Sequence, residues 1–253
     1  MTQSHNKQQN RLFFAAIHCI AASRTVSISH AIANIQIAQL TGCDGVFLVA
    51  HGVPLSGMIK ICESTREAFP HFFIGVNLLQ GKMKEEEISE LQYLAVLVQR
   101  MNALWSDYIP QRDPKLSKHS SEMRFFSSVA MKYQNPNPDP YRLRNSTRMA
   151  QSRSDAVVTS GDTTGTPPTQ LKIEMIRTVL SPSTPLIIAS GIAVENVRGF
   201  RDADGFIVGT SISGRDHHHE YGVCDMLDVL KINELRAAIN EMPESSRPTR
   251  RLL

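Results

Sequence analysis

Short apolar stretches alternate with longer amphipathic stretches from Leu12 to the end of the chain. Most of the short stretches are continuously apolar, which is typical of parallel strands that are buried on both faces. Eight of them are predicted to be strands, at Leu12–Ile20, Gly45–Ala50, His71–Leu79, Ala103–Tyr108, Met123–Met131, Asp155–Thr159, Pro185–Ala189 and Gly205–Val208.

Several segments between these strands have the apolar spacing of an amphipathic helix. Helices are predicted at Ser29–Leu40, at Glu85–Met101, from Pro167-Pro168 onward, near Val194 and at Asp225–Met242. By contrast, residues 110–121 are short, polar and contain two prolines. Because proline disrupts a helix interior, we expect a loop there with at most a turn or two of helix.

Eight strands that alternate with about eight helices fit one closed (β/α)8 TIM barrel of the α/β class. An open doubly wound sheet is the alternative, but it would call for a G-x-G-x-x-G motif after an early strand, and none of these strands ends in one. We therefore predict a single barrel at residues 11–242 with a poorly formed fourth helix. Residues 1–10 and the basic segment 243–253 are predicted to be flexible ends.

Composition narrows the class of protein further. The chain is 42% hydrophobic and 20% charged, as in ordinary soluble globular proteins, and its net charge is only +3 without a long basic stretch, which argues against nucleic acid as a partner. The four cysteines form no C-x-x-C pair, which favours a reducing compartment. No segment has the apolar length of a membrane span, and the N-terminal segment lacks the features of a signal peptide. We expect a cytoplasmic protein, with homo-oligomerisation left open.

In a TIM barrel, functional groups lie at the carboxyl ends of the strands. Every predicted strand ends in a polar residue or a glycine: His18, His51, Asn77, Asp107, Lys132-Tyr133, the run Ser160 to Gly165, Ser190-Gly191 and Gly209-Thr210. For any single residue, the alternative to a functional role is that it is polar only because loops are polar in general. The set as a whole contains histidine and lysine, which are costly to bury without a role, and it therefore indicates a site.

The last two strands carry the clearest motif. Ser190-Gly191 and Gly209-Thr210 place small residues at two neighbouring strand ends, where backbone amides can approach an anion. TIM barrels frequently bind phosphate at this position. The alternative is that these glycines only form tight turns. The predicted ligand is a phosphorylated small molecule.

Lys132 is the leading candidate for chemistry, because an amine that is desolvated at a strand end has a lowered pKa and suits Schiff-base or acid–base work. The alternative is a lysine that reaches the rim or pairs with Asp107 or Asp162. His18 is a candidate acid or base, or else a hydrogen-bonded core histidine. The run His217 to His219 is not expected to bind a metal, because adjacent loop histidines cannot all face one ion.

Longer motifs extend over most of the chain: SDAVVTSGDTTGTPPTQL, PLIIASGIAVENV, ADGFIVGTSIS and DMLDVLKINELRAAI, with shorter ones at IHCI, GCDGVFLV, IGVNLL and SSVAMKY. Together they resemble the BtpA/SgcQ family of ribulose-phosphate-binding-type barrels. The resemblance implies that the ligand end is lined by Thr164, Gly165, Ser190, Gly191, Asn196, Gly209 and Thr210, with His18, Asn77 and Lys132 in the pocket.

Three features depart from this family. Val49-Ala50-His51 stands where the family tends to have an acidic residue and an asparagine, AASRTVSIS replaces a loop containing Pro-Gly, and the region after strand four is shortened. The lost polar groups weaken the expectation that the family's chemistry is intact.

The leading interpretation is therefore a BtpA-like barrel that binds a sugar phosphate or nucleotide-like metabolite and acts as an isomerase or lyase without a cofactor or metal. Lys132, His18 and Asp107 are its predicted catalytic groups. Its predicted ligand-binding residues are Asn77, Asp162, Thr164, Gly165, Ser190, Gly191, Gly209 and Thr210. The alternative is a non-catalytic assembly or stability factor that keeps the barrel and the anion pocket. Convergence of the three catalytic candidates and the strand 7 and 8 glycines on one cavity would favour the enzyme.

Overall fold

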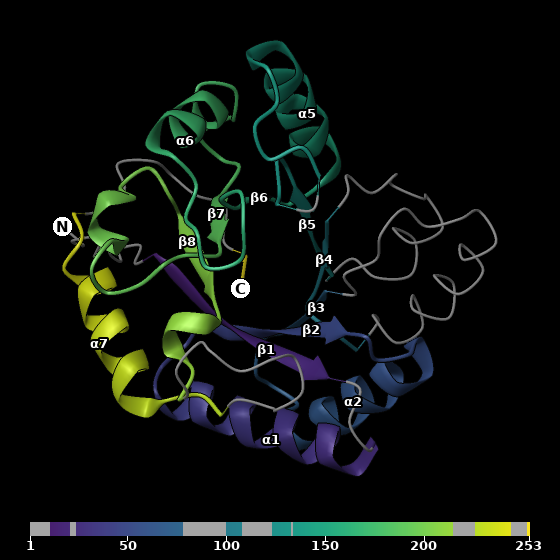
Figure 1. Cartoon of the computed structure of the whole chain (residues 1–253). Helices are drawn as coiled ribbons and strands as arrows, with labels where there is room; N and C mark the ends of the chain where they lie inside the picture. Colours follow the sequence, from purple (N-terminus) through teal and green to yellow (C-terminus); the bar gives the residue numbers. More distant parts are fainter. Residues whose placement is uncertain are drawn as a thin grey trace, which may run out of the picture.

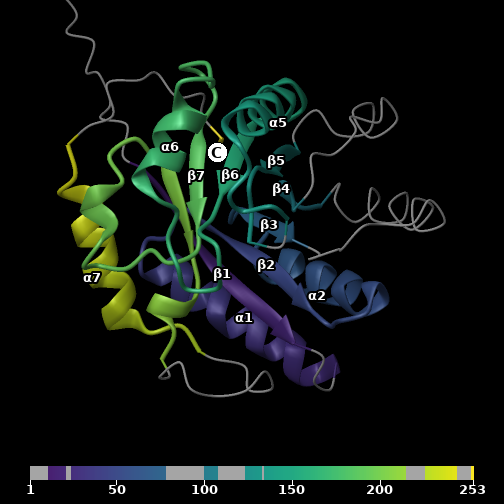
Figure 2. The same ribbon diagram turned by 45° about the horizontal axis from the view of Figure 1, so that its top comes forward.

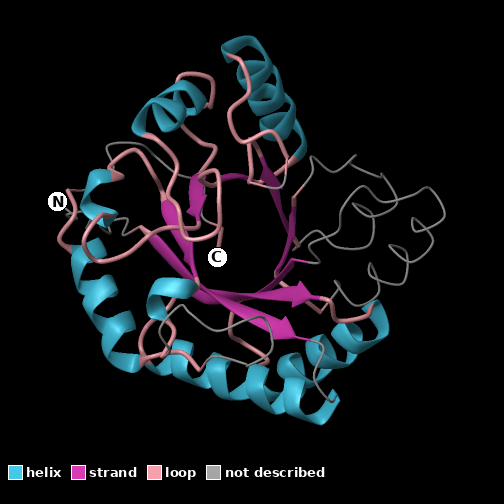
Figure 3. Ribbon diagram, viewed as in Figure 1, coloured by secondary structure: helices cyan, strands magenta, loops and turns pink. Residues whose placement is uncertain are grey.

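The computed structural model describes residues 11–20, 24–77, 100–107, 123–132, 134–214, 226–243 and 252–253, with the side chains of 24–26 and 55 left out. Eight parallel strands within these residues form one closed barrel, in which each strand pairs with the next and the eighth pairs with the first. Helices surround the ring of strands on the outside (Figures 1 and 3). The predicted TIM barrel is confirmed.

The strands are β1 (Leu12–Ile20), β2 (Gly45–His51), β3 (Ile74–Asn77), β4 (Ala103–Ser106), β5 (Arg124–Ser128), β6 (Ala156–Thr159), β7 (Leu186–Ala189) and β8 (Gly205–Val208). All eight were predicted from the apolar pattern. β5 is shorter than predicted because Val129, Ala130 and Met131 are buried in the turn that follows it. A strand predicted from its apolar residues alone is therefore too long when a buried turn follows it.

The helices are α1 (Arg24–Leu40), α2 (Leu55–Ala68), α5 (Pro140–Arg153), α6 (Gln170–Arg177) and α7 (Val229–Asn240), with 3-10 turns η2 (Val197–Gly199) and η3 (Thr210–Ile212). Figure 2 shows α1 and α2 together on the outside of β1 and β2. Helices α2 and α5 were not predicted. Where a helix was predicted near Val194, the structure has only the 3-10 turn η2. Apart from Arg100 and Met101, the helix predicted at Glu85–Met101 lies outside the described residues, as do the predicted loop at 110–121 and the predicted end 1–10.

The interior of the barrel is filled by aromatic rings in the half where the strands begin. Phe14, Phe47, Phe73 and Phe126 contact one another with ring centroids 5.1–6.2 Å apart. Gly75 makes room for one of these rings, because a Cβ atom there would overlap the ring of Phe47. Leu252 is also buried in this interior cluster. The amino half of the barrel is therefore solid.

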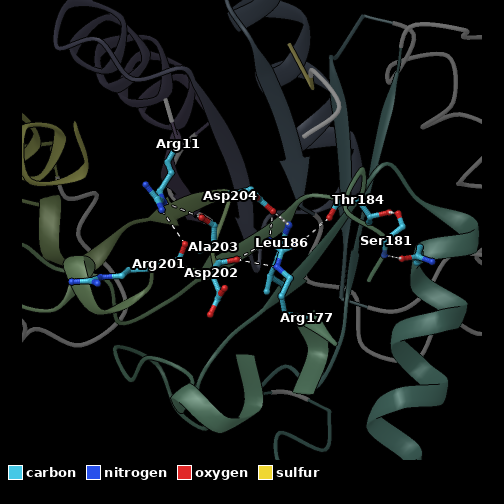
Figure 4. Close-up of polar contacts among 10 residues, drawn as sticks. Arg11, Arg177, Ser181, Thr184, Leu186, Arg201, Asp202, Ala203 and Asp204 are labelled. Carbon is cyan, nitrogen blue, oxygen red and sulfur yellow. Dashed lines mark hydrogen bonds and ion pairs between the residues drawn. The ribbon is translucent and has the colours of Figure 1, made fainter. Parts of the chain in front are cut away.

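Two buried arginines fix the segment that leads into β8 (Figure 4). Arg177 from α6 forms an ion pair with Asp204 and donates to the carbonyl of Asp202. Asp204 also accepts a hydrogen bond of 2.8 Å from the backbone N–H of Leu186 at the start of β7. Arg11, ahead of β1, donates to the carbonyls of Arg201 and Ala203 (2.9 and 3.0 Å). These contacts join β1, β7 and β8 at their amino ends.

Candidate functional site

A cavity of about 700 Å³ opens at the carboxyl ends of the strands. Its floor is apolar and consists of Ala16, Val49, Trp105, Met131, Ala189 and Ile207. The Trp105 indole N–H donates to Ser128 Oγ at 2.9 Å, which fixes the ring in the floor. The polar groups of the cavity therefore lie above a fixed apolar surface, as is typical of small-molecule sites.

One side of the cavity holds four titratable side chains, from the ends of β1, β2, β4 and β5. They are His18, His51, Asp107 and Lys132. The rings of His18 and His51 lie against each other, with centroids 4.6 Å apart. Every second side chain of a strand points to the same side of a sheet. The side chains that come after the floor residues of neighbouring strands and point inward therefore meet above the floor.

Desolvation is the largest cause of the pKa shifts of His18, His51 and Lys132, and it lowers all three values. The His18 side chain is exposed to the cavity, but desolvation by the surrounding protein, together with His51 and the Lys132 charge, lowers its pKa to about 4. The same effects, desolvation first, lower the pKa of His51. Desolvation also lowers the pKa of Lys132, against the opposing effect of Asp107. Both imidazoles are therefore neutral at neutral pH.

Asp107 is a buried carboxyl group at the edge of the cavity. Burial raises its pKa, while the hydrogen bond from Asn77 and the charge of Lys132 oppose this shift. The Asn77 amide donates to Asp107 Oδ1 at 3.2 Å, and the Gln134 amide donates to the Asp107 backbone carbonyl. Asn77 itself is buried and does not line the cavity. In this position the Asn77 amide supports the carboxyl group.

The opposite side of the cavity consists of the turns after β6, β7 and β8. Ser190 and Gly191 both have positive φ angles, 101° and 68°. The Gly165 backbone N–H donates to Ser190 Oγ at 3.1 Å, and a Cβ atom on Gly191 would overlap the backbone of Pro167. The turns after β6 and β7 are therefore packed directly on each other, and only glycine fits at position 191.

Asn196 holds the turn after β7 from behind. Its side-chain amide donates to the carbonyl of Gly191 at 2.7 Å, and its side-chain oxygen accepts from the N–H of Ala193 at 3.0 Å. The Ser211 hydroxyl donates to the carbonyl of Ile192 at 2.5 Å, linking this turn to η3. Asn196, which the family resemblance places at the ligand end, thus shapes the turn and does not line the cavity.

Lys132 connects the two sides of the cavity. Its Nζ donates to Thr164 Oγ1 at 3.1 Å, and its backbone N–H donates to Ser160 Oγ at 3.1 Å. Ser160 is fully buried and its hydroxyl is engaged in this contact, so it does not serve as a nucleophile. Asp162 is exposed, accepts a hydrogen bond from the Asn137 amide at 2.8 Å and is not among the lining residues.

The structure brings most of the predicted site residues to this one cavity: His18, Asp107, Lys132, Thr164, Gly165, Ser190, Gly191, Gly209 and Thr210. Asn77 and Asp162 do not line it. The sequence reasoning listed His51 but not its pairing with His18, and it did not find Trp105, Met131 or the buried Lys172. Tyr133 and the run His217 to His219 lie outside the described residues.

Within the described part of the chain, no three His, Cys, Asp or Glu side chains are grouped to hold a metal ion. None of the described helices has the length and apolar character needed to cross a membrane. The described residues that line the cavity present amine, imidazole, carboxyl, hydroxyl and backbone amide groups.

A closed parallel barrel with titratable groups and tight turns around one cavity defines an enzyme-like TIM barrel. The model of the BtpA family matches residues 116–237, just under half of the chain. This match confirms the family resemblance from the region before β5 into α7, which includes Lys132 and the turns after β6, β7 and β8. The parts of the resemblance in β1 to β3 lie outside the matched residues.

Many solved structures share the fold, and two of them illustrate the likeness. One, described as "Native KDPGal structure", is 12% identical with a TM-score of 0.56, and the match covers 90% of this chain and 92% of that one. The other is the spore coat polysaccharide biosynthesis protein SpsE of Bacillus subtilis, also 12% identical with a TM-score of 0.56, where the match covers 97% of this chain and 75% of that one. No curated protein sequence matches the chain. At this identity, the likeness concerns the fold alone.

Proposed function

We propose that this protein is an enzyme of the isomerase or lyase type that binds a phosphorylated small molecule and uses Lys132 on a carbonyl group of that ligand. The observation that carries this proposal is the convergence of Lys132, Asp107 and His18 on one cavity with the small residues at the ends of β7 and β8. The two sides of the cavity suit the two ends of such a ligand.

The phosphate group is assigned to the turns after β7 and β8. The first N–H groups of a 3-10 turn have no partner within the turn, and η3 begins at Thr210 beside the cavity. Ser190 and Thr210 add hydroxyl groups at the same rim. Backbone amides and hydroxyl groups at such turns favour an anion.

Lys132 is assigned to the carbonyl group. Its lowered pKa makes a larger fraction of the amine neutral, which is the form that attacks a carbonyl carbon. The amine adds to the carbonyl carbon and passes a proton to the neutral His18 imidazole, and the oxygen leaves as water after Asp107, whose pKa is raised, supplies a proton, so that an imine forms. A proton is then removed from the carbon beside the imine and returned at a neighbouring carbon. Addition of water to the new imine restores the amine and releases the isomerised carbonyl compound.

The proposal is tested with pyridoxal 5′-phosphate, a probe that carries an aldehyde and a phosphate, and with pyridoxal, which lacks the phosphate. Borohydride reduction and peptide mass spectrometry identify the lysine that forms the imine. We expect preferential labelling of Lys132. The phosphate should accelerate labelling about tenfold or more, because hydrogen bonds to a charged group are worth about 1.5–3 kcal/mol.

Lys132→Arg should abolish this labelling but keep the thermal stabilisation by a panel of sugar phosphates, because it leaves the β7 and β8 turns unchanged. Lys60→Arg, on the exposed side of α2, is the matched control. If Lys132 reacts no faster than Lys60, the enzymatic proposal is wrong. If in addition phosphate compounds still stabilise the protein, the non-catalytic factor with an anion pocket is the better account.

A further inference from the structure

Lys172 is a buried lysine that the proposed chemistry does not use. It lies on α6, and only 6% of its surface is exposed. Its Nζ donates to the backbone carbonyls of Ala130 and Ser160, at 2.6 and 2.7 Å. Burial of an amine is unfavourable unless it is hydrogen-bonded, so these two contacts are what permits a lysine at this position.

The two carbonyls belong to the turns that leave β5 and β6, neighbouring strands of the barrel. Ala130 has a φ angle of 53°, a left-handed conformation that is unfavourable for residues other than glycine. The contact with Lys172 fixes the Ala130 carbonyl in the direction that this conformation requires. Lys172 thus holds a strained turn in place.

That turn leads directly to Lys132. Met131 enters the interior cluster, and Lys132 follows it into the cavity. Ser160, whose carbonyl binds Lys172, accepts the backbone N–H of Lys132 with its hydroxyl at 3.1 Å. Lys172 therefore contacts the residue two positions before Lys132 and also the residue that holds the Lys132 backbone.

We propose that Lys172 is a positioning residue that sets the place of the Lys132 amine in the cavity by holding the ends of β5 and β6 together. It reaches no ligand itself, and its effect passes through the backbone of Ala130 and Ser160. This inference rests on the proposed function, since it assigns a role in placing the group that forms the imine.

The charge state of Lys172 does not decide this role. Burial lowers its pKa to about 8, against the opposing effect of Asp162. A neutral amine still has two hydrogens, and an ammonium group has three, so either form can donate to both carbonyls. The link between β5 and β6 is thus kept on both sides of that pH.

The test compares labelling of Lys132 by pyridoxal 5′-phosphate in the wild type and in Lys172→Met, which has an apolar side chain of similar length. We expect labelling to slow about ten- to hundredfold, the effect of displacing a reacting group by about 1 Å. Thermal stabilisation by inorganic phosphate should be unchanged, because the β7 and β8 turns are untouched. Lys172→Arg keeps the donors and the charge and should recover part of the rate.

Lys231→Met is the matched control, because Lys231 Nζ also donates to a turn carbonyl, that of Ser213 at 2.8 Å, but away from Lys132. It should lower the melting temperature without slowing the labelling. A folded Lys172→Met that labels Lys132 at the wild-type rate would overturn the inference. If that variant does not fold, Lys172→Gln decides, because its shorter amide side chain keeps N–H donors but cannot reproduce both contacts of Nζ: slower labelling supports the positional link and an unchanged rate refutes it. If the wild type itself is not labelled at Lys132, the proposed function and this inference both fail.

Discussion

The stacked pair of His18 and His51 shows how single residues acquire properties at the end of a strand. His18 lies near the carboxyl end of β1 and His51 is the last residue of β2, and the charge of Lys132 acts on both rings. A positive charge and a poorly solvated surrounding act in the same direction on an imidazole, because both disfavour its protonated form. The pair therefore offers neutral donors and acceptors to a ligand.

We expect the His18 imidazole to titrate near its pKa of about 4 in the folded protein, against an ordinary value of 6.5. Between these two pH values the unfolded chain binds a proton that the folded chain does not, so this residue reduces stability as the pH falls through that range. Lys132→Met should raise the pKa of both His18 and His51, because it removes a positive charge. Titration of the imidazole C–H signals by NMR measures both effects. A wild-type His18 midpoint near 6.5 would contradict this expectation.

At the residue scale, sequence reasoning found most of the cavity because carboxyl ends of parallel strands meet at one rim. It placed Asp162 and Asn77 at the cavity, which neither of them lines. The direction of the Asp162 side chain depends on the course of its turn, and that of the Asn77 side chain depends on the neighbouring Asp107 carboxyl group. Lys172 gave no signal in the sequence, because a lysine on an amphipathic helix is ordinarily solvated. Its burial follows from how α6 packs on the ends of β5 and β6.

At the scale of elements, the strands were easier to predict than the helices. α2 buries Thr65, whose hydroxyl donates to the carbonyls of Ile61 and Cys62, and α5 is held to the barrel by Leu143, Thr147 and Ala150. Threonine and alanine at buried positions weaken the apolar periodicity on which a helix prediction rests. The capping residue Asp139 and the following Pro140 were the available signals for the start of α5.

The packing of the turns after β6 and β7 gives a prediction at this scale. Gly191→Ala should lower the free energy of unfolding by about 2–4 kcal/mol, because the new methyl group combines a left-handed backbone with overlap on Pro167. It should also remove the thermal stabilisation by phosphate compounds. Gly199→Ala is the matched control, since a Cβ atom there has open space, and its effect should stay within about 0.5 kcal/mol. Urea unfolding of both variants measures the difference; equal stabilities would show that the two turns are not packed as described.

At the scale of the whole molecule, the buried pair of Arg177 and Asp204 joins α6 to the amino ends of β7 and β8, next to the place where β8 pairs with β1 and closes the barrel. Loss of one partner leaves a buried charge without compensation, which is far more costly than loss of an exposed ion pair. No motif in the sequence indicated this pair, because it joins a helix to a turn that lies 27 residues further along the chain.

We expect Arg177→Met to reduce the free energy of unfolding by about 3–5 kcal/mol. Asp204→Asn added to that variant should restore part of the loss, because it removes the uncompensated charge. Arg198→Met, which breaks the exposed pair with Glu241, should cost no more than about 1 kcal/mol. Chemical denaturation of the three variants provides these values. A similar cost for the Arg177 and Arg198 variants would mean that the buried pair does not stabilise this junction.

The aromatic rings in the amino half of the barrel also bear on kinetics. Phe14, Phe47, Phe73 and Phe126 fill the barrel interior on the amino side of the cavity, so in the part of the chain that the structure describes the cavity opens at the carboxyl ends of the strands. In the proposed enzyme, substrate would enter and product would leave through this opening. A bound product would then exclude the next substrate molecule, and we expect product inhibition that is competitive with substrate.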